Sequence, residues 1–142
     1  MLQGAVRLML VNSPAIAFLV LFTLLLQGTA NASSQVAKGG WAGEHIVVEV
    51  SEKSAEIEFD CARGQVTQPM TLDKHGDFDV IGTFTREHGG PVRRDENPPS
   101  TPARYSGHID GNSMSITVTL GQENVGTFAL TRGASPHLTK CR

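Results

Sequence analysis

The segment from residue 86 to residue 104 carries the side chains best suited to binding chemistry. Arg86, Arg93 and Arg94 could together hold a carboxylate, sulfate or phosphate, because a guanidinium donates two parallel hydrogen bonds to such a group. The Gly89–Gly90 pair would let backbone amides approach the same anion. The segment is also longer than an ordinary connection, and connections of this length are mostly functional or disordered. It is therefore the first candidate for a recognition loop.

A second interpretation makes the same segment an ordinary solvated loop. Glu87, Asp95 and Glu96 nearly cancel the arginines, and exposed ion pairs of this kind contribute little stability. If the recognition hypothesis holds, the residues that bind a ligand or partner are Arg86, Glu87, His88, Gly89, Gly90, Arg93, Arg94 and Tyr105.

The chain has five histidines, but their spacing does not favour a metal site. His108 and Asp110 would share one face of a strand, yet no His-x-His or His-x3-His pair occurs. Three aspartates between residues 73 and 79 resemble half of a calcium loop, but its twelfth position is Phe84 instead of a glutamate. We expect no metal and no other cofactor.

The sequence also gives no support for catalysis. Residues 111–115 and 133–137 begin like the Gly-x-Ser-x-Gly motif of serine hydrolases, and neither completes it. Glu56, Glu58 and Asp60 lie on one strand face, which we expect to face solvent because apolar residues alternate with them. The chain is therefore interpreted as a protein without enzyme activity.

The first 32 residues have the pattern of a signal peptide. Arg7 supplies a positive charge, residues 15–26 are almost entirely apolar, and Ala30 and Ala32 are the small residues that a signal peptidase reads. Cleavage after Ala32 would deliver the protein to the periplasm or the extracellular space. The alternative is an uncleaved membrane anchor, since residues 8–26 are just long enough to span a bilayer.

Length and charge limit the class of protein further. A chain of 142 residues is the size of one domain, and 12 Lys and Arg against 14 Asp and Glu give a formal charge of −2. This balance offers no positive surface for a phosphate backbone, so a nucleic-acid partner is not expected. We expect a signal peptide over 1–32, a flexible leader over 33–40 and a single, monomeric domain over 41–142.

After residue 40 the hydrophobic pattern has a period of two, which is typical of half-buried strands. It is clearest in residues 55–61 and in Met114–Leu120, which follows the turn Asp110-Gly111-Asn112. Further strands are expected over residues 46–50, 66–72, 78–84, 105–109, 126–130 and 137–141. We find no helix period. The prediction is an all-β fold, a small antiparallel up-and-down barrel or a sandwich of about eight short strands.

A resemblance to known proteins points the same way. Gly39-Gly40-Trp41 fits the Gly-x-Trp opening of lipocalin-like barrels. The run from Tyr105 to Met114, followed by Gly126 to Arg132, resembles the closing hairpins of small secreted bacterial β-barrel proteins of unassigned function. The resemblance implies a calyx-like architecture and carries over no ligand and no catalytic residue.

Two functions are compatible with these patterns. The leading hypothesis is an exported binding module for a protein, or for a small apolar or anionic ligand held in the barrel mouth. The alternative is a protein inhibitor or envelope-associated interaction protein, in which the proline-rich 86–104 loop inserts into a partner. A ligand carrier would have inward side chains too small to fill the barrel, whereas an inhibitor would present its loop over a filled interior.

Cys61 and Cys141 are an even pair in a chain expected to be exported, and disulfides persist in that setting. The alternative is a pair of buried free thiols. A bridge would close a loop of about 80 residues and stabilise the fold by about 3 to 5 kcal/mol in the chain-entropy picture.

Replacing Cys61 with Ala should therefore lower the melting temperature by about 10 °C or more, measured by circular dichroism without reductant. An unchanged melting temperature would contradict the disulfide.

Overall fold

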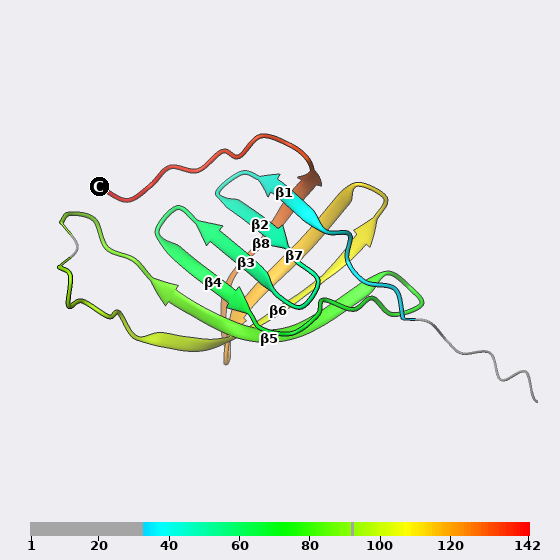
Figure 1. Cartoon of the computed structure of the whole chain (residues 1–142), viewed down its shortest axis with the longest axis horizontal. Coiled ribbons are helices and arrows are strands. Elements are labelled where there is room, and N and C mark those ends of the chain that lie inside the picture. The colour runs from blue at the N-terminus through cyan, green and yellow to red at the C-terminus, as the bar shows by residue number, and fades with distance from the viewer. Residues whose placement is uncertain (1–32, 92) are drawn as a thin grey trace, which may run out of the picture. The chain divides into compact units, whose positions relative to one another are not determined.

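The computed structural model describes residues 33–91 and 93–142, so the predicted signal peptide lies outside the described residues. The described residues form eight strands and no helix. The strands are β1 (Gly39–Gly43), β2 (Ile46–Val50), β3 (Ala55–Phe59), β4 (Ala62–Val66), β5 (Asp77–Arg86), β6 (Ser100–Asp110), β7 (Ser113–Leu120) and β8 (Glu123–Arg132). Each strand pairs with the next in antiparallel fashion, and β8 pairs with β1 (Figure 1). The prediction of an all-β fold is confirmed, and the sheet is a closed barrel.

The alternating pattern sets which side chains face inward. In β2 the buried residues are Ile46, Val48 and Val50. In β3 the first, third and fifth residues are buried, and Glu56 and Glu58 between them are exposed. Successive side chains of a strand point to opposite faces, so this spacing gives each strand one apolar face and one polar face. The hairpin at Gly111 is also confirmed, with β6 ending at Asp110 and β7 beginning at Ser113.

Large side chains fill the interior, and glycines on other strands make room for them. Tyr105 is fully buried, and its ring and hydroxyl occupy the space where a side chain at Gly64 would lie. The hydroxyl donates a hydrogen bond of 2.7 Å to the Thr83 carbonyl. Phe78 packs in the same way over Gly107, its partner on β6. The structure therefore places Tyr105, one of the expected binding residues, in the core and not on the surface.

One end of the barrel is closed by the segment that we expected to be a flexible leader. The Val36 amide donates to the Met70 carbonyl at 2.9 Å, and the Leu72 amide donates to the Ser34 carbonyl at 2.7 Å. Val36 and Met70 are both buried. Ordered structure thus begins before Trp41, whose indole Nε1 donates to the Ala37 carbonyl at 3.0 Å.

Two of the expected strands are absent from the described residues. Residues 67–76 form an irregular connection with one isolated bridge at Thr71, and the neighbouring strand is β4 instead. Two of the three inward residues of β4, Ala62 and Gly64, are small, so only Val66 marks this strand in the hydrophobic pattern. Residues 137–141 make only one bridge, between His137 and Glu44.

The long connection between β5 and β6 is shorter than predicted. Strand pairing runs to Thr85 and Ser100, so residues 100–104 belong to β6 and Arg86 ends β5. Arg104 Nε donates to Asp79 Oδ1 at 2.7 Å across these two strands. The remaining connection is residues 87–99, which we call the β5–β6 loop.

The contact between Tyr105 and Gly64 gives a test of the core. Gly64→Ala should destabilise the barrel by about 1 to 3 kcal/mol, because a Cβ there overpacks the interior against the hydroxyl. In a Tyr105→Phe background, the same substitution should cost less, because the colliding oxygen is gone. Urea unfolding of the four proteins measures the difference. Equal costs in both backgrounds would show that Gly64 is not under the tyrosine.

Candidate functional site

A wide hollow lies on the outer face of the barrel. It is a groove of about 570 Å³ over β2, β3, β4 and β5, with the β5–β6 loop along one side. The lining residues are Val47, Glu49, Glu56, Ile57, Glu58, Arg63, Gly64, Gln65, Thr83, Thr85, Glu87, Asn97, Pro98 and Ser100. Most of them are the polar, outward residues of strands whose inward residues form the core.

Strand register places three glutamates in this groove with one arginine, and the β5–β6 loop adds Glu87. Glu49 lies directly opposite Glu56, and Glu58 lies opposite Arg63. Arg63 pairs with Glu87 at 3.7 Å. Among the described residues, neither Glu49 nor Glu56 pairs with a cation, although like charges directly opposite each other destabilise strand pairing. The groove therefore carries a net negative charge.

The arginines expected to form an anion site have different surroundings. Arg86 Nη2 donates to Glu123 Oε1 at 2.7 Å, and its guanidinium lies 5.6 Å from the centre of the Phe84 ring. Phe84 and Phe128 both pack against Phe59 at the same end of the barrel, with ring centres 5.3 Å and 5.6 Å away. Arg86 thus covers this aromatic cluster and joins β5 to β8.

The other expected site residues are spread along the β5–β6 loop. Arg93 lines a second hollow of about 420 Å³ beside Asp95 and Glu96, and Arg94 is exposed. Gly90 has a φ of 94°, in the region that glycine adopts most easily. Of the residues predicted from the sequence, Glu87 lines the large groove.

Several groove residues were missed by the sequence reading. The expectation that Glu56 and Glu58 face solvent is confirmed, while Glu49, Gln65 and Asn97 belong to no sequence motif. Each is an ordinary polar residue in its own segment. Strand pairing brings the strand residues together, and the β5–β6 loop adds Asn97. The one available signal was the alternation of acids with apolar residues in β3.

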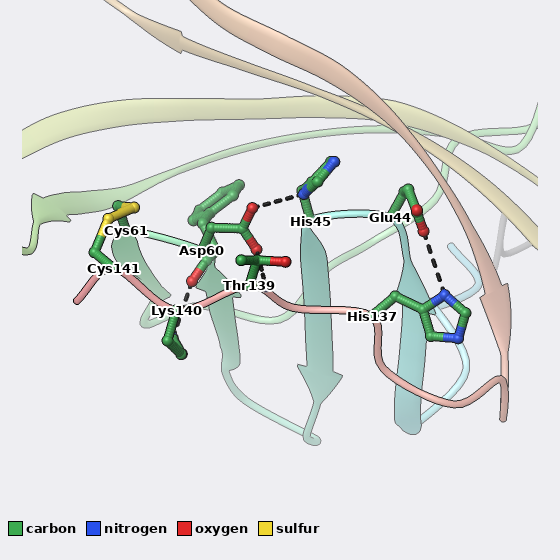
Figure 2. A network of polar contacts seen from close by, with 9 residues as sticks. Glu44, His45, Asp60, Cys61, His137, Thr139, Lys140 and Cys141 are labelled. Carbon is green, nitrogen blue, oxygen red and sulfur yellow. Dashed lines mark hydrogen bonds and ion pairs between the residues drawn. A yellow bond between two sulfur atoms is a disulfide. The ribbon is translucent and has the colours of Figure 1, made fainter.

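Beside the groove, the C-terminal residues 133–142 form a strap across the hairpins at one barrel end (Figures 1 and 2). The His45 amide donates to the His137 carbonyl at 3.0 Å, and the His137 ring binds Glu44 at 3.3 Å. His45 is held at a φ of 67°, which a non-glycine residue rarely adopts. The β1–β2 hairpin is thus shaped around its contact with the strap.

Farther along the strap, Asp60 and the disulfide provide the contacts (Figure 2). The Thr139 amide donates to Asp60 Oδ1 at 2.7 Å, and a hydrogen bond of 2.6 Å joins His45 to Asp60. The Thr139 hydrogen bond and the neighbouring His45 hold the pKa of the Asp60 carboxyl below its ordinary value. Cys61 and Cys141 are bonded, with Cα atoms 5.3 Å apart, which confirms the predicted disulfide.

Lys140 connects the strap to the groove. Its Nζ pairs with Glu58 Oε1 at 2.7 Å and donates to the Phe59 carbonyl at 2.9 Å. Beyond the disulfide, the Arg142 carbonyl lies where a Cβ on Gly89 would be, so the strap also touches the β5–β6 loop. The strap therefore contacts both the floor of the groove and the loop beside it.

Comparison with models of known families, with curated proteins and with solved structures finds no match. Within residues 33–91 and 93–142, no group of three or more His, Cys, Asp or Glu is placed to hold a metal ion. The described part of the chain also has no helix that could span a membrane. The fold alone defines the class: a small, closed, eight-stranded antiparallel β-barrel with one disulfide.

His88 offers a pH-dependent test of loop structure. Hydrogen bonds to the Gly89 carbonyl and to the Glu96 carboxylate raise the pKa of His88 above its ordinary value of 6.5. A raised pKa in the folded state means that these contacts stabilise the loop below pH 6.5 and are lost as the pH rises through the raised pKa.

A nuclear magnetic resonance titration should give a His88 pKa above 6.5, and Glu96→Gln should lower it. The matched control is Glu87→Gln, since Glu87 binds Arg63 and should leave His88 unchanged. A His88 pKa that does not respond to Glu96→Gln would contradict the ion pair.

Proposed function

We propose that the protein is an exported binding module that recognises a partner protein on its outer surface, through the groove over β2–β5 and the adjacent β5–β6 loop. The partner segment that fits best is an extended peptide with lysine or arginine side chains. The main support for this proposal is where the groove lies. Large side chains occupy the barrel interior, and the groove is on the outer surface, where a partner protein can reach it.

The packed interior favours a partner protein over a small ligand in the barrel mouth. Trp41, Tyr105, Ile46, Met114 and Ile116 are fully buried inward residues. A ligand carrier needs inward side chains that leave a cavity, and these side chains are large. The likeness to lipocalin-like barrels enters the proposal as a likeness of architecture, without the central ligand site that a calyx implies.

The charge of the groove favours a basic segment. Four carboxylates face one guanidinium there, and the Glu49–Glu56 pair has no cation of its own among the described residues. A lysine or arginine side chain seated between these two carboxylates would relieve their repulsion. The polar residues Gln65, Thr83 and Asn97 offer hydrogen-bonding groups to a peptide backbone in the same groove.

Export is supported by two independent features. The first 32 residues have the pattern of a signal peptide. The disulfide between Cys61 and Cys141 is typical of proteins that work in an oxidising compartment. A binding module in the periplasm or the extracellular space would meet its partner there.

Binding can be measured with a fluorescent ten-residue peptide of alternating lysine and serine, using fluorescence anisotropy. Glu56→Gln should weaken binding by about threefold or more, because one partly screened ion pair is lost. Added salt should weaken binding to the unaltered protein.

The matched control is Glu52→Gln, since Glu52 is exposed and pairs with Lys38 outside the groove. It should bind the peptide as the unaltered protein does. Equal losses in Glu56→Gln and Glu52→Gln, or equal binding of a glutamate–serine peptide, would refute the groove as a site for basic segments.

A further inference from the structure

The strap of residues 133–142 is fastened to the barrel without forming part of its core. Every strap residue is exposed except Leu138, which is half-buried. The barrel closes through β1 and β8, where Trp41, Ala42 and Gly43 pair with residues 130–132, before the strap begins. Removing the strap from its position would therefore uncover little apolar surface and break no pairing between strands.

Apart from the disulfide, the contacts that hold the strap are polar and lie at the surface. Its amide and carbonyl groups bind Gly40, His45 and Asp60, and its side chains bind Glu44 and Glu58. Exposed contacts of this kind contribute little individually. The Cys61–Cys141 bond keeps the strap at a high local concentration beside the barrel residues that it contacts. The weak polar contacts are therefore enough to hold the strap in one position while the bond is intact.

We propose that the Cys61–Cys141 disulfide is a redox latch: its reduction releases the strap from a barrel that stays folded and raises the affinity of the groove for basic segments. The second part rests on the proposed function. The reductant is a dithiol, which is oxidised to its own disulfide while Cys61 and Cys141 each gain one electron and one proton as free thiols. Cys141 is exposed, so a dithiol can approach it.

Lys140 links the latch to the charge of the groove. In the fastened strap, its ammonium group neutralises Glu58, which is one of the groove carboxylates. Release removes this cation and leaves Glu58 facing only Arg63, which already pairs with Glu87. Release also removes the contact of Arg142 with Gly89, near the start of the β5–β6 loop. Both changes make the groove more negative and more accessible.

The release can be tested by amide hydrogen exchange of the mature protein, with and without dithiothreitol. Reduction should speed exchange at His45, Thr139 and Cys141, whose amides bind the strap or belong to it. Amides of β6 and β7 should stay far better protected than those of the strap, and the near-ultraviolet circular dichroism of Trp41 should not change. Cys61→Ser/Cys141→Ser should show the same pattern without reductant.

Two results would overturn the release. If the strap amides stay protected after reduction, the polar contacts hold it alone. If the amides of β6 and β7 come to exchange as fast as those of the strap, reduction unfolds the whole barrel and the bond is not a latch. Neither result depends on any ligand, so the exchange data judge the release separately from the proposed function.

The effect on the groove is tested with the same lysine–serine peptide. Reduction should strengthen its binding about threefold or more, and Lys140→Gln should do so in the oxidised protein, since both free Glu58. Lys38→Gln is the matched control, because Lys38 pairs with Glu52 outside the groove. Equal affinities in both redox states would overturn the link between latch and groove. No peptide binding in either state would instead refute the proposed function.

Discussion

The structure depends on how large side chains pack against glycines inside a small closed barrel. The Tyr105 ring lies over Gly64, and the Phe78 ring lies over Gly107. Because glycine has no side chain, the backbone at each of these two positions can approach the ring closely. The buried Tyr105 hydroxyl binds the Thr83 carbonyl, and burial raises its pKa, which keeps it neutral. These side chains occupy the interior, and the groove over β2–β5 lies on the outer face of the barrel.

The outside is organised by charge. Strand pairing collects carboxylates over β2 and β3, while the strap brings Lys140 to the edge of the same surface. Histidines contact carboxylates at several connections, as in the pairs His45–Asp60 and His88–Glu96. Polar contacts thus join the strap to the β1–β2 and β3–β4 hairpins, and the Cys61–Cys141 bond holds the strap in place.

Much of the fold was predictable because alternation and turn residues act locally. Residues 46–50 and 113–120 show their inward faces in the sequence, and Asp110-Gly111-Asn112 marks the turn between β6 and β7. β1 was missed as a strand, since it is largely glycine and alanine around Trp41. β4 was missed for a similar reason: two of its three inward residues are small, and the Tyr105 ring fills the space over one of them, Gly64.

The sequence by itself determined the all-β class and the period of most strands, because these depend on residue type and short-range spacing. The disulfide was predictable for a different reason, because the chain has only two cysteines and the pattern of an exported protein. The tertiary structure alone decided which polar residues meet. Glu49 and Glu56 face each other through strand register, Arg86 binds Glu123, and Tyr105 belongs to the core. The Glu49–Glu56 contact depends on the register of one hairpin, and the Arg86–Glu123 contact joins strands far apart in the chain, so neither can be read from a local pattern.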